Sequence, residues 1–288
     1  MNNLFCFGLG YSARALGQHL RQEGWYVGGT TRAPANAAAL AADGFDAFVF
    51  DGTQPGSGVA DALSRATHVV VSAPPDTDGD PVLRHYAKAL ADSPVLEWVG
   101  YLSTIGVYGD RQGDWVDETT PPAPTSQRSQ QRLAAENAWL DFGAKTNKRV
   151  DIFRLSGIYG PGRSAFDRLR NGTAQRIVKP GQVFNRIHVD DITQALCAAI
   201  AGRGIHRVYN VTDSEPAPPE DVVTFAAELL QIPPPPPVQF EHAELSPMAA
   251  SFYGENKRVH NERLRQELGV ALKFPSYREG LRAILTRD

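Results

Sequence analysis

Residues 4–32 read LFCFGLGYSARALGQHLRQEGWYVGGTTR and contain a strand, a glycine turn, a helix and a second strand. Leu4–Phe7 is an apolar run of strand type, and Trp25–Val27 begins the second strand. Between them, apolar residues recur at helical spacing at Ala15, Leu16 and Leu20. This order within about thirty residues is typical of the unit that binds the pyrophosphate of a dinucleotide.

The turn between the first strand and the helix carries the chemistry of that unit. Gly8 permits the tight turn, and Gly10 lets the backbone approach a pyrophosphate at the helix N-terminus, where unpaired N–H groups point outward. Ala13 replaces the usual third glycine and is small enough for close helix–strand packing. We predict dinucleotide binding here; a tight turn that binds nothing is the alternative. The expected contacts are Gly8, Gly10, Tyr11, Ser12 and Ala13.

The end of the second strand indicates which dinucleotide binds. NAD-binding versions of the unit place Asp or Glu there, to accept a hydrogen bond from the ribose 2′-hydroxyl. Here Thr31 and Arg32 occupy the position, and no carboxylate follows until Asp43. A guanidinium pairs with phosphate oxygens through two parallel hydrogen bonds. Arg32 therefore favours NADP over NAD, and the alternative is a surface arginine that is only solvated.

Composition limits the class of protein. A chain of 288 residues has room for one large α/β domain and a smaller lobe. The formal net charge of −3 offers no basic surface for nucleic acid. Cys6 and Cys197 are typical of small buried hydrophobes rather than of a disulfide, and the scattered histidines predict no metal site. With no signal-peptide pattern and no apolar run near ~18 residues, we expect a cytoplasmic protein without membrane contact.

Strands and helices alternate through the first half of the chain. The apolar runs of strand type are Phe45–Phe50, His68–Ser72, Leu96–Ser103 and Arg149–Leu155, and the helical stretches lie near 35–42, 58–65, 81–92 and 127–143. This alternation predicts an α/β fold, a doubly wound parallel sheet of Rossmann type. Ligands bind such sheets at the carboxyl ends of the strands, so segments far apart in the sequence are expected to meet at one crevice.

The pattern changes after about residue 156. A glycine–proline loop, Gly157–Gly162, precedes a helix at Asp190–Ile200 that Asp190 or Asp191 is expected to cap. The remaining segments are a strand at Val208–Val211, a helix at Pro219–Leu230 and a stiff connector at Pro233–Pro237. We expect residues 1–156 to form the dinucleotide-binding domain, with sheet contributions from about 185–212. Residues 157–288 are expected to form a smaller, interleaved substrate-binding lobe.

Four more motifs with characteristic residue types lie between residues 101 and 211. They are YLSTIGVYG at 101–109, RLSGIYGPG at 154–162, IHVDD at 187–191 and YNV at 209–211. Together with the turn, in this order and spacing, they resemble the extended branch of the short-chain dehydrogenase/reductase superfamily, the NAD-dependent epimerase/dehydratase group. The resemblance covers roughly residues 4–215. It implies an oxidoreductase, epimerase or dehydratase that acts on a small or nucleotide-linked sugar substrate.

The sequence departs from this family on the catalytic helix. The family places Tyr-x-x-x-Lys a few residues before a small–small–Glu turn, and that turn is present here as Ala134, Ala135 and Glu136. Counting back puts Arg128 at the tyrosine position and Arg132 at the lysine position. In the family the tyrosine is the acid/base, and the lysine lowers its pKa and holds the nicotinamide ribose. Because arginine stays protonated and is a poor general base, the chain resembles the atypical subgroup that binds cofactor with a degraded catalytic set.

The resemblance implies catalytic roles for three residues. Thr104 aligns with the Ser/Thr that hydrogen-bonds the reacting oxygen, although a β-branched residue that ends a strand would look the same. Arg128 could polarise a carbonyl or clamp a phosphate, or be a solvated helix arginine. Tyr108 is a candidate replacement acid, whereas in the family this tyrosine is generally structural or faces the substrate.

The resemblance also implies further binding residues. Asp51 resembles the aspartate that contacts adenine, with a turn cap as the alternative. Arg132 keeps the ability to hydrogen-bond the ribose. The complete set of expected cofactor contacts beyond the turn is Thr31, Arg32, Asp51, Ala73, Pro74 and Arg132, and the expected substrate contacts are Tyr159, Phe166, Asn185 and Arg186.

Two functions remain open from the sequence. The first is an NADP-binding enzyme of epimerase, dehydratase or reductase type with a small-molecule substrate. The second is a non-enzymatic, NADP-responsive binding or regulatory protein, which Arg128 and Arg132 favour. Family members often dimerise through the helix at 127–143. Its apolar residues suit either a homodimer contact or core packing, and they are Leu133, Ala134, Trp139 and Leu140.

Overall fold

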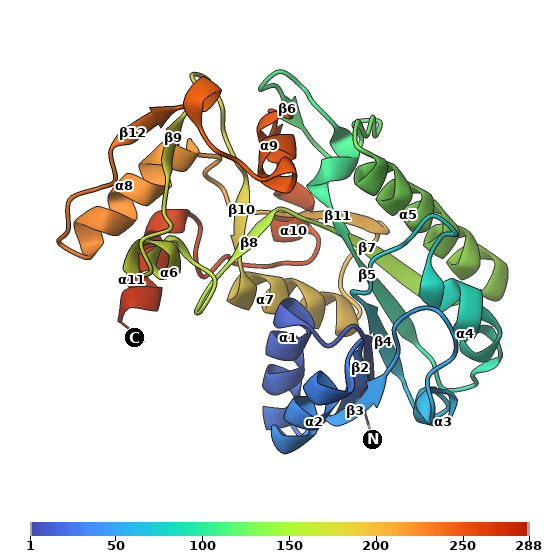
Figure 1. Ribbon diagram of the computed structural model, residues 1–288. Coiled ribbons are helices and arrows are strands. Elements are labelled where there is room, and N and C mark those ends of the chain that lie inside the picture. Colours follow the sequence, from blue (N-terminus) through green and yellow to red (C-terminus); the bar gives the residue numbers. More distant parts are fainter. Residues whose placement is uncertain (1, 287–288) are drawn as a thin grey trace. The chain divides into compact units, whose positions relative to one another are not determined.

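The computed structural model describes residues 2–286. A seven-stranded sheet consists of β1 Asn3–Phe7, β2 Tyr26–Thr31, β3 Asp46–Val49, β4 His68–Val71, β5 Trp98–Thr104, β7 Arg149–Leu155 and β11 Val208–Val211. Its spatial order is β11-β7-β5-β4-β1-β2-β3 (Figure 1), and the pairs from β3 through β5 are parallel. Chain order reverses between β1 and β4, so the crevice for a ligand is expected at the carboxyl ends of these two strands.

Helices cover both faces of this sheet, as the doubly wound fold requires. They are α1 Tyr11–Gln22, α2 Pro34–Ala42, α3 Val59–Leu63, α4 Pro81–Asp92, α5 Gln127–Thr146 and α7 Val189–Ile200. Figure 1 shows α1 and α2 on one side of the sheet and α3, α4 and α5 on the other. The predicted α/β fold of Rossmann type is confirmed.

The chain divides into two compact units. The first contains the chain up to Thr104, Gln127–Arg154 and Thr193–Tyr209. The second contains Ile105–Ser126, Leu155–Ile192 and the chain from Asn210 onward. Because the units exchange segments several times along the sequence, neither is a continuous stretch of chain.

The second unit consists of short elements. Its strands are β6 Trp115–Val116, β8 Gly157–Tyr159, β9 Arg176–Val178, β10 Arg186–His188, β12 Pro237–Gln239 and β13 Arg258–Val259. Its helices are η1 Ile105–Tyr108, α6 Ala165–Arg170, α8 Pro219–Leu229, η2 Phe240–His242, α9 Pro247–Tyr253, α10 Glu262–Gln266 and α11 Tyr277–Leu285. The strands pair in parallel as β10 with β8, β12 with β9 and β13 with β6. Strands of two or three residues are too short to show a hydrophobic period, which is why the sequence did not predict most of them.

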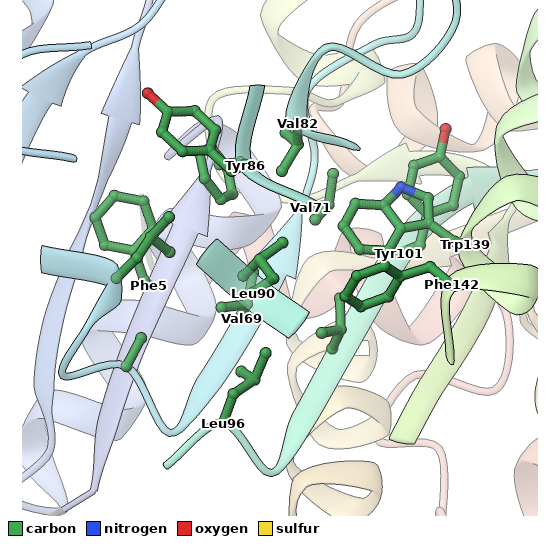
Figure 2. Close-up of a cluster of buried hydrophobic side chains, with 14 of the residues drawn as sticks. Phe5, Val69, Val71, Val82, Tyr86, Leu90, Leu96, Tyr101, Trp139 and Phe142 are labelled. Carbon is green, nitrogen blue, oxygen red and sulfur yellow. The ribbon is translucent and has the colours of Figure 1, made fainter. Parts of the chain in front are cut away.

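The core of the first unit lies between the sheet and the helices α3, α4 and α5. Figure 2 shows side chains of β1, β4 and β5 packed with those of α4 and α5. Trp139 of α5 is fully buried in this cluster, and Leu140 packs against it. Core packing therefore accounts for these two apolar residues of α5, and homodimerisation through this helix stays a prediction.

The entry to α7 differs from the expectation. The helix begins at Val189, so Asp190 and Asp191 lie in its first turn rather than at the cap. The backbone N–H of Asp190 donates to His188 Nδ1 at 3.1 Å. The Asp191 carboxylate instead accepts from the backbone N–H groups of Lys273 and Phe274, at 2.7 and 3.1 Å. Asp191 thus anchors a segment distant in sequence, which local capping rules do not reveal.

Candidate functional site

The glycine turn follows β1 at the point where the strand order reverses. Gly8 has φ +86°, a conformation that favours glycine, and a Cβ there would lie 3.0 Å from the backbone nitrogen of Ala73, just past β4. The turn is held from β2, because the Gly8 N–H donates to Thr30 Oγ1 at 3.0 Å and the Leu9 N–H donates to Thr30 O at 2.7 Å. These bonds fix the backbone that precedes α1.

The reason for a glycine at position 10 differs from the reason at position 8. It is the N-cap of α1 with φ −88°, which any residue adopts, and no atom of the described chain would lie within 4 Å of an added Cβ. No side chain caps the helix at this position in the described chain. The helix N-terminus therefore presents N–H groups next to open space, which is the arrangement that accepts an anion. Ala13 is fully buried one turn on, as close helix–strand packing requires.

The end of β2 presents Arg32 to solvent. Thr31 is half-buried and Arg32 is exposed, and within residues 2–286 Arg32 forms no ion pair. The next carboxylate, Asp43, is paired with Arg14 of α1, and its backbone carbonyl accepts from Arg21 Nη1 at 2.7 Å. Asp43 is therefore bound by arginines of α1. Arg32, at the end of β2, has no carboxylate paired with it among the described residues.

The other expected contacts beside the turn lie on loops. Asp51 is exposed, and its Oδ1 accepts from the backbone N–H and the hydroxyl of Thr53 at 2.9 and 2.7 Å. The hydrogen bonds from Thr53 hold the pKa of Asp51 below its usual value. This is the turn-capping geometry that the sequence left as an alternative. Ala73 is half-buried beside Gly8, and Pro74 is exposed.

Two adjacent hydroxyls at the end of β5 have different surroundings. Ser103 is buried and donates to Glu136 Oε1 at 2.5 Å. Glu136 is also paired with the Arg154 guanidinium of β7, at 3.1 Å to Nε and 2.7 Å to Nη2. Thr104, one residue on, is half-buried at the strand end. Of the two hydroxyls, Thr104 is therefore the one placed toward the end of the sheet where ligands bind.

Arg132, at the position of the family's lysine, contacts β5. Its Nη1 donates to Tyr101 Oη at 3.1 Å and to the carbonyl of Leu102 at 2.9 Å. Arg132 and Glu136 lie one turn apart on α5, so they anchor Leu102 and Ser103, the two residues before Thr104. Arg128 is exposed in the first turn of α5. The sequence did not reveal this anchoring, because the contacts join α5 to a strand about thirty residues earlier.

Tyr108 is buried, and its hydroxyl bonds to another residue of the second unit. Its side chain is 0% exposed, and its hydroxyl donates to Asn210 Oδ1 at 2.8 Å within the second unit. A hydroxyl buried in this way offers no face to a substrate. The burial argues against Tyr108 as a replacement acid.

The four expected substrate contacts lie inside the second unit. Phe166 is 0% exposed in an apolar cluster with Tyr159, and its contact with a substrate stays a prediction. The Tyr159 hydroxyl donates to Ser276 O at 3.3 Å, and burial raises its pKa. An aromatic residue suits a core as well as a pocket, and both rings pack in the core of this unit.

The two polar members of this set bind protein groups. Asn185 is buried, donates from Nδ2 to Lys257 O at 2.9 Å and accepts from the Val259 N–H at 2.9 Å. Arg186 donates from Nη1 to the carbonyls of Phe184 and Ala217, at 2.9 and 3.1 Å. Both side chains therefore hold the loops around β10 together, and their contact with a substrate stays a prediction.

Residues 2–286 contain neither a metal-binding cluster nor a membrane-spanning helix. No group of three or more His, Cys, Asp or Glu side chains is arranged to hold a metal ion there. None of the helices in that range has the length and apolar character needed to cross a lipid bilayer.

Comparison with known proteins gives a consistent result. The model of the NAD dependent epimerase/dehydratase family matches residues 8–212. A functionally unknown conserved protein from Silicibacter pomeroyi DSS, whose structure is solved, is 47% identical with a TM-score of 0.89, covering 100% of this chain and 99% of that one. Protein YeeZ of Escherichia coli K12 is 29% identical over 287 residues, 96% of this chain and 97% of YeeZ. UDP-glucuronic acid 4-epimerase from Bacillus cereus, solved with NAD, shares the fold at 16% identity and a TM-score of 0.75, covering 100% and 99% of the two chains.

Proposed function

The chain belongs to the NAD-dependent epimerase/dehydratase family, and on that basis we propose that it is an NADP-dependent oxidoreductase acting on a small or nucleotide-sugar substrate. One observation carries the proposal. At the reversal of strand order, the backbone at Gly8 approaches Ala73 closely, and the next glycine, Gly10, caps α1 beside open space. This arrangement supports binding of a dinucleotide's pyrophosphate at the N-terminus of α1.

Arg32 supports the choice of NADP within this proposal. The residue follows β2, where an acidic side chain would accept from the 2′-hydroxyl of NAD, and it is exposed with its charge available. A 2′-phosphate gains a charge-assisted contact from such a guanidinium, whereas a 2′-hydroxyl gains little.

Replacing Arg32 by alanine is expected to weaken NADP(H) binding about tenfold and to leave NAD(H) binding unchanged, because only NADP carries the phosphate. Calorimetric titration of both variants with both cofactors measures the effect. Arg65→Ala, a change at another exposed arginine of the same unit, is the control. Equal losses for NADP(H) and NAD(H) would show that Arg32 does not read the phosphate.

The residues at the end of β5 and on α5 could stabilise negative charge on the reacting oxygen. When bound, NADPH supplies a hydride to a substrate carbonyl. Thr104 would donate a hydrogen bond to the oxygen on which charge develops, and Arg128 would add a fixed positive charge. Neither group removes a proton from an alcohol well, because arginine stays protonated. With no general acid or base at these positions, the proton on the product oxygen would come from water.

Removal of the Thr104 hydroxyl tests this role. Thr104→Val, which keeps the shape of the side chain, is expected to lower kcat about a hundredfold with little change in KM for NADPH. Thr104→Ser keeps the hydroxyl and should retain most of the activity. Steady-state NADPH consumption measures both variants, and undiminished turnover in Thr104→Val would remove Thr104 from the mechanism.

A second function is favoured by Arg128, Arg132 and the burial of Tyr108. These observations leave no general acid at the family's catalytic positions, as expected for an NADP-responsive binding protein. A panel of carbonyl compounds and nucleotide sugars separates the two proposals. NADPH binding without NADPH consumption across the panel would favour the second function.

A further inference from the structure

Three consecutive side chains of α4 bind the loop that joins β3 to α3. Arg84 Nη2 donates to the carbonyl of Gly52 at 3.0 Å, and His85 Nε2 lies 3.0 Å from the same oxygen. Because a carbonyl can only accept, this ring nitrogen carries the proton. The Tyr86 hydroxyl accepts from the backbone N–H of Gly56 at 2.7 Å. The loop is therefore fixed to α4 at two points along its length.

Arg84 also binds the loop that joins β4 to α4. Its Nη1 and Nη2 donate to the two carboxylate oxygens of Asp76, at 3.0 and 2.8 Å, which is the paired geometry that gives arginine its strongest contacts with carboxylates. Asp76 lies in a tight turn, since its N–H donates to Gly79 O at 3.0 Å and its Oδ1 accepts from the Asp78 N–H at 2.8 Å. One guanidinium thus joins both loops.

The two loops follow strands that are not neighbours. In the sheet order β4-β1-β2-β3, two strands separate β4 from β3. Both loops leave the carboxyl ends of their strands, the edge of the sheet at which a dinucleotide binds. The loop after β4 lies beside the glycine turn, because the Ala73 N–H donates to Phe7 O at 3.0 Å next to Gly8. The contacts of Arg84 therefore link the proposed pyrophosphate site to the loop after β3.

Asp51 is the side chain that this link positions. It directly precedes Gly52, whose carbonyl is held by α4. Asp51 is exposed, and the two hydrogen bonds from Thr53 both go to Oδ1, so the carboxylate has capacity for a further donor. With the pyrophosphate at Gly8 and the 2′-phosphate at Arg32, the adenine is the part of the cofactor expected to extend beyond β2 toward β3. Its 6-amino group is a donor that suits this carboxylate.

Resting on the proposed function, we propose that Arg84 is a positioning residue that fixes Asp51 where it accepts from the 6-amino group of adenine. Nη2 of Arg84 uses both of its hydrogens on the two loops, so the side chain acts on the cofactor through them. This role differs from that of Arg32, which is proposed to contact the 2′-phosphate. Because NADPH and NADH carry the same base, Arg84 serves the binding of both.

Arg84→Met tests this role when NADPH is compared with an analogue in which hypoxanthine replaces adenine. The analogue has an oxygen in place of the 6-amino group, so it offers Asp51 no donor at that position. Calorimetric titration of the wild-type protein is expected to show about tenfold tighter binding of NADPH than of the analogue. In Arg84→Met this ratio should fall to about twofold or less, and NADPH and NADH should lose affinity by the same factor.

Two results of these titrations would overturn the proposal. An unchanged ratio in Arg84→Met would show that Arg84 does not position the group that reads the base. A loss of affinity confined to NADPH would show instead that Arg84 acts on the 2′-phosphate.

A double-mutant cycle tests whether Arg84 acts through Asp51. Asp51→Ala removes the carboxylate and should bring the ratio of the two affinities close to one. Adding Arg84→Met should then leave this ratio and the NADPH affinity within about twofold of those of Asp51→Ala alone. Losses that multiply in the double variant would overturn the proposal, because the two side chains would then act separately.

Lys88→Met is the matched control, because Lys88 forms an exposed ion pair with Asp92 on the same helix. It should leave the NADPH affinity and the ratio within about twofold of wild type. Thermal unfolding without nucleotide checks for a structural effect. The side chains of Arg84 and Asp76 are 30% and 47% exposed, so Arg84→Met should change Tm little. A large fall in Tm with an unchanged ratio would overturn the positioning role.

The titration of the wild-type protein separates this inference from the proposed function. If the protein binds no NADPH, the proposed function fails and the role of Arg84 fails with it. If it binds NADPH and the hypoxanthine analogue equally well, only the inference about Asp51 and Arg84 fails.

Discussion

Replacing Gly10 by valine is expected to weaken NADP(H) binding by roughly a hundredfold or more while the protein stays folded. The backbone at Gly10 suits any residue, and a Cβ there meets no atom of the described chain. The added side chain would instead occupy the space beside the N-terminus of α1, where the pyrophosphate is proposed to lie. Loss of the glycine cap should reduce stability by only about 1 kcal/mol.

Two comparisons make this prediction specific. Gly8→Val should damage the fold itself, because Gly8 has a positive φ and its Cβ would approach the backbone of Ala73. Gly24, at the end of α1, also has positive φ but faces open space far from the turn in sequence, so Gly24→Asn is the control for a harmless change. A folded Gly10→Val protein with wild-type NADP(H) affinity would show that the turn is structural only.

Replacing Glu136 by alanine is expected to destabilise the protein by about 3–5 kcal/mol. Glu136 and Arg154 are both buried, and the change would leave the guanidinium without its partner and Ser103 without its acceptor. Equilibrium unfolding in urea measures the loss. The control is Glu23→Ala, in an exposed pair with His19, which should change stability by less than about 1 kcal/mol.

A second variant tests the cause of that loss. Glu136→Leu combined with Arg154→Met removes both charges and keeps apolar volume, so it should recover much of the stability. A Glu136→Ala protein within about 1 kcal/mol of wild type would contradict the account of this pair. Because Glu136 also anchors Ser103, next to Thr104, such a result would weaken the argument for how Thr104 is held.

The sequence predicted the parts of the structure that depend on local patterns. The glycine turn, the buried runs of β4 and β5 and the helix α4 are each specified by neighbouring residues, and the structure has them where expected. The strands of the second unit are too short for any period to show. The cap of α7 was misplaced because Asp191 bonds to Lys273 and Phe274, far along the chain.

The candidate site likewise has parts that local patterns predict and parts that depend on long-range contacts. The turn at Gly8–Ala13 is local: Gly8 is favoured by its positive φ, and Ala13 by close packing of the helix. The assignment of Phe166, Asn185 and Arg186 to a substrate came from family resemblance alone, and the structure uses them for packing and loop contacts. Residue type does not distinguish a buried aromatic from a pocket wall. The role of Glu136 depends on long-range contacts with Ser103 and Arg154 that no short motif contains.

The most direct test of the account is calorimetric titration of the nucleotide-free protein with NADPH and NADH side by side. The account predicts one NADPH bound per chain, with an affinity at least about tenfold higher than that for NADH. Preference for NADH would contradict the role given to Arg32. Binding of neither nucleotide would contradict the central claim that the turn at Gly8–Ala13 is a dinucleotide site.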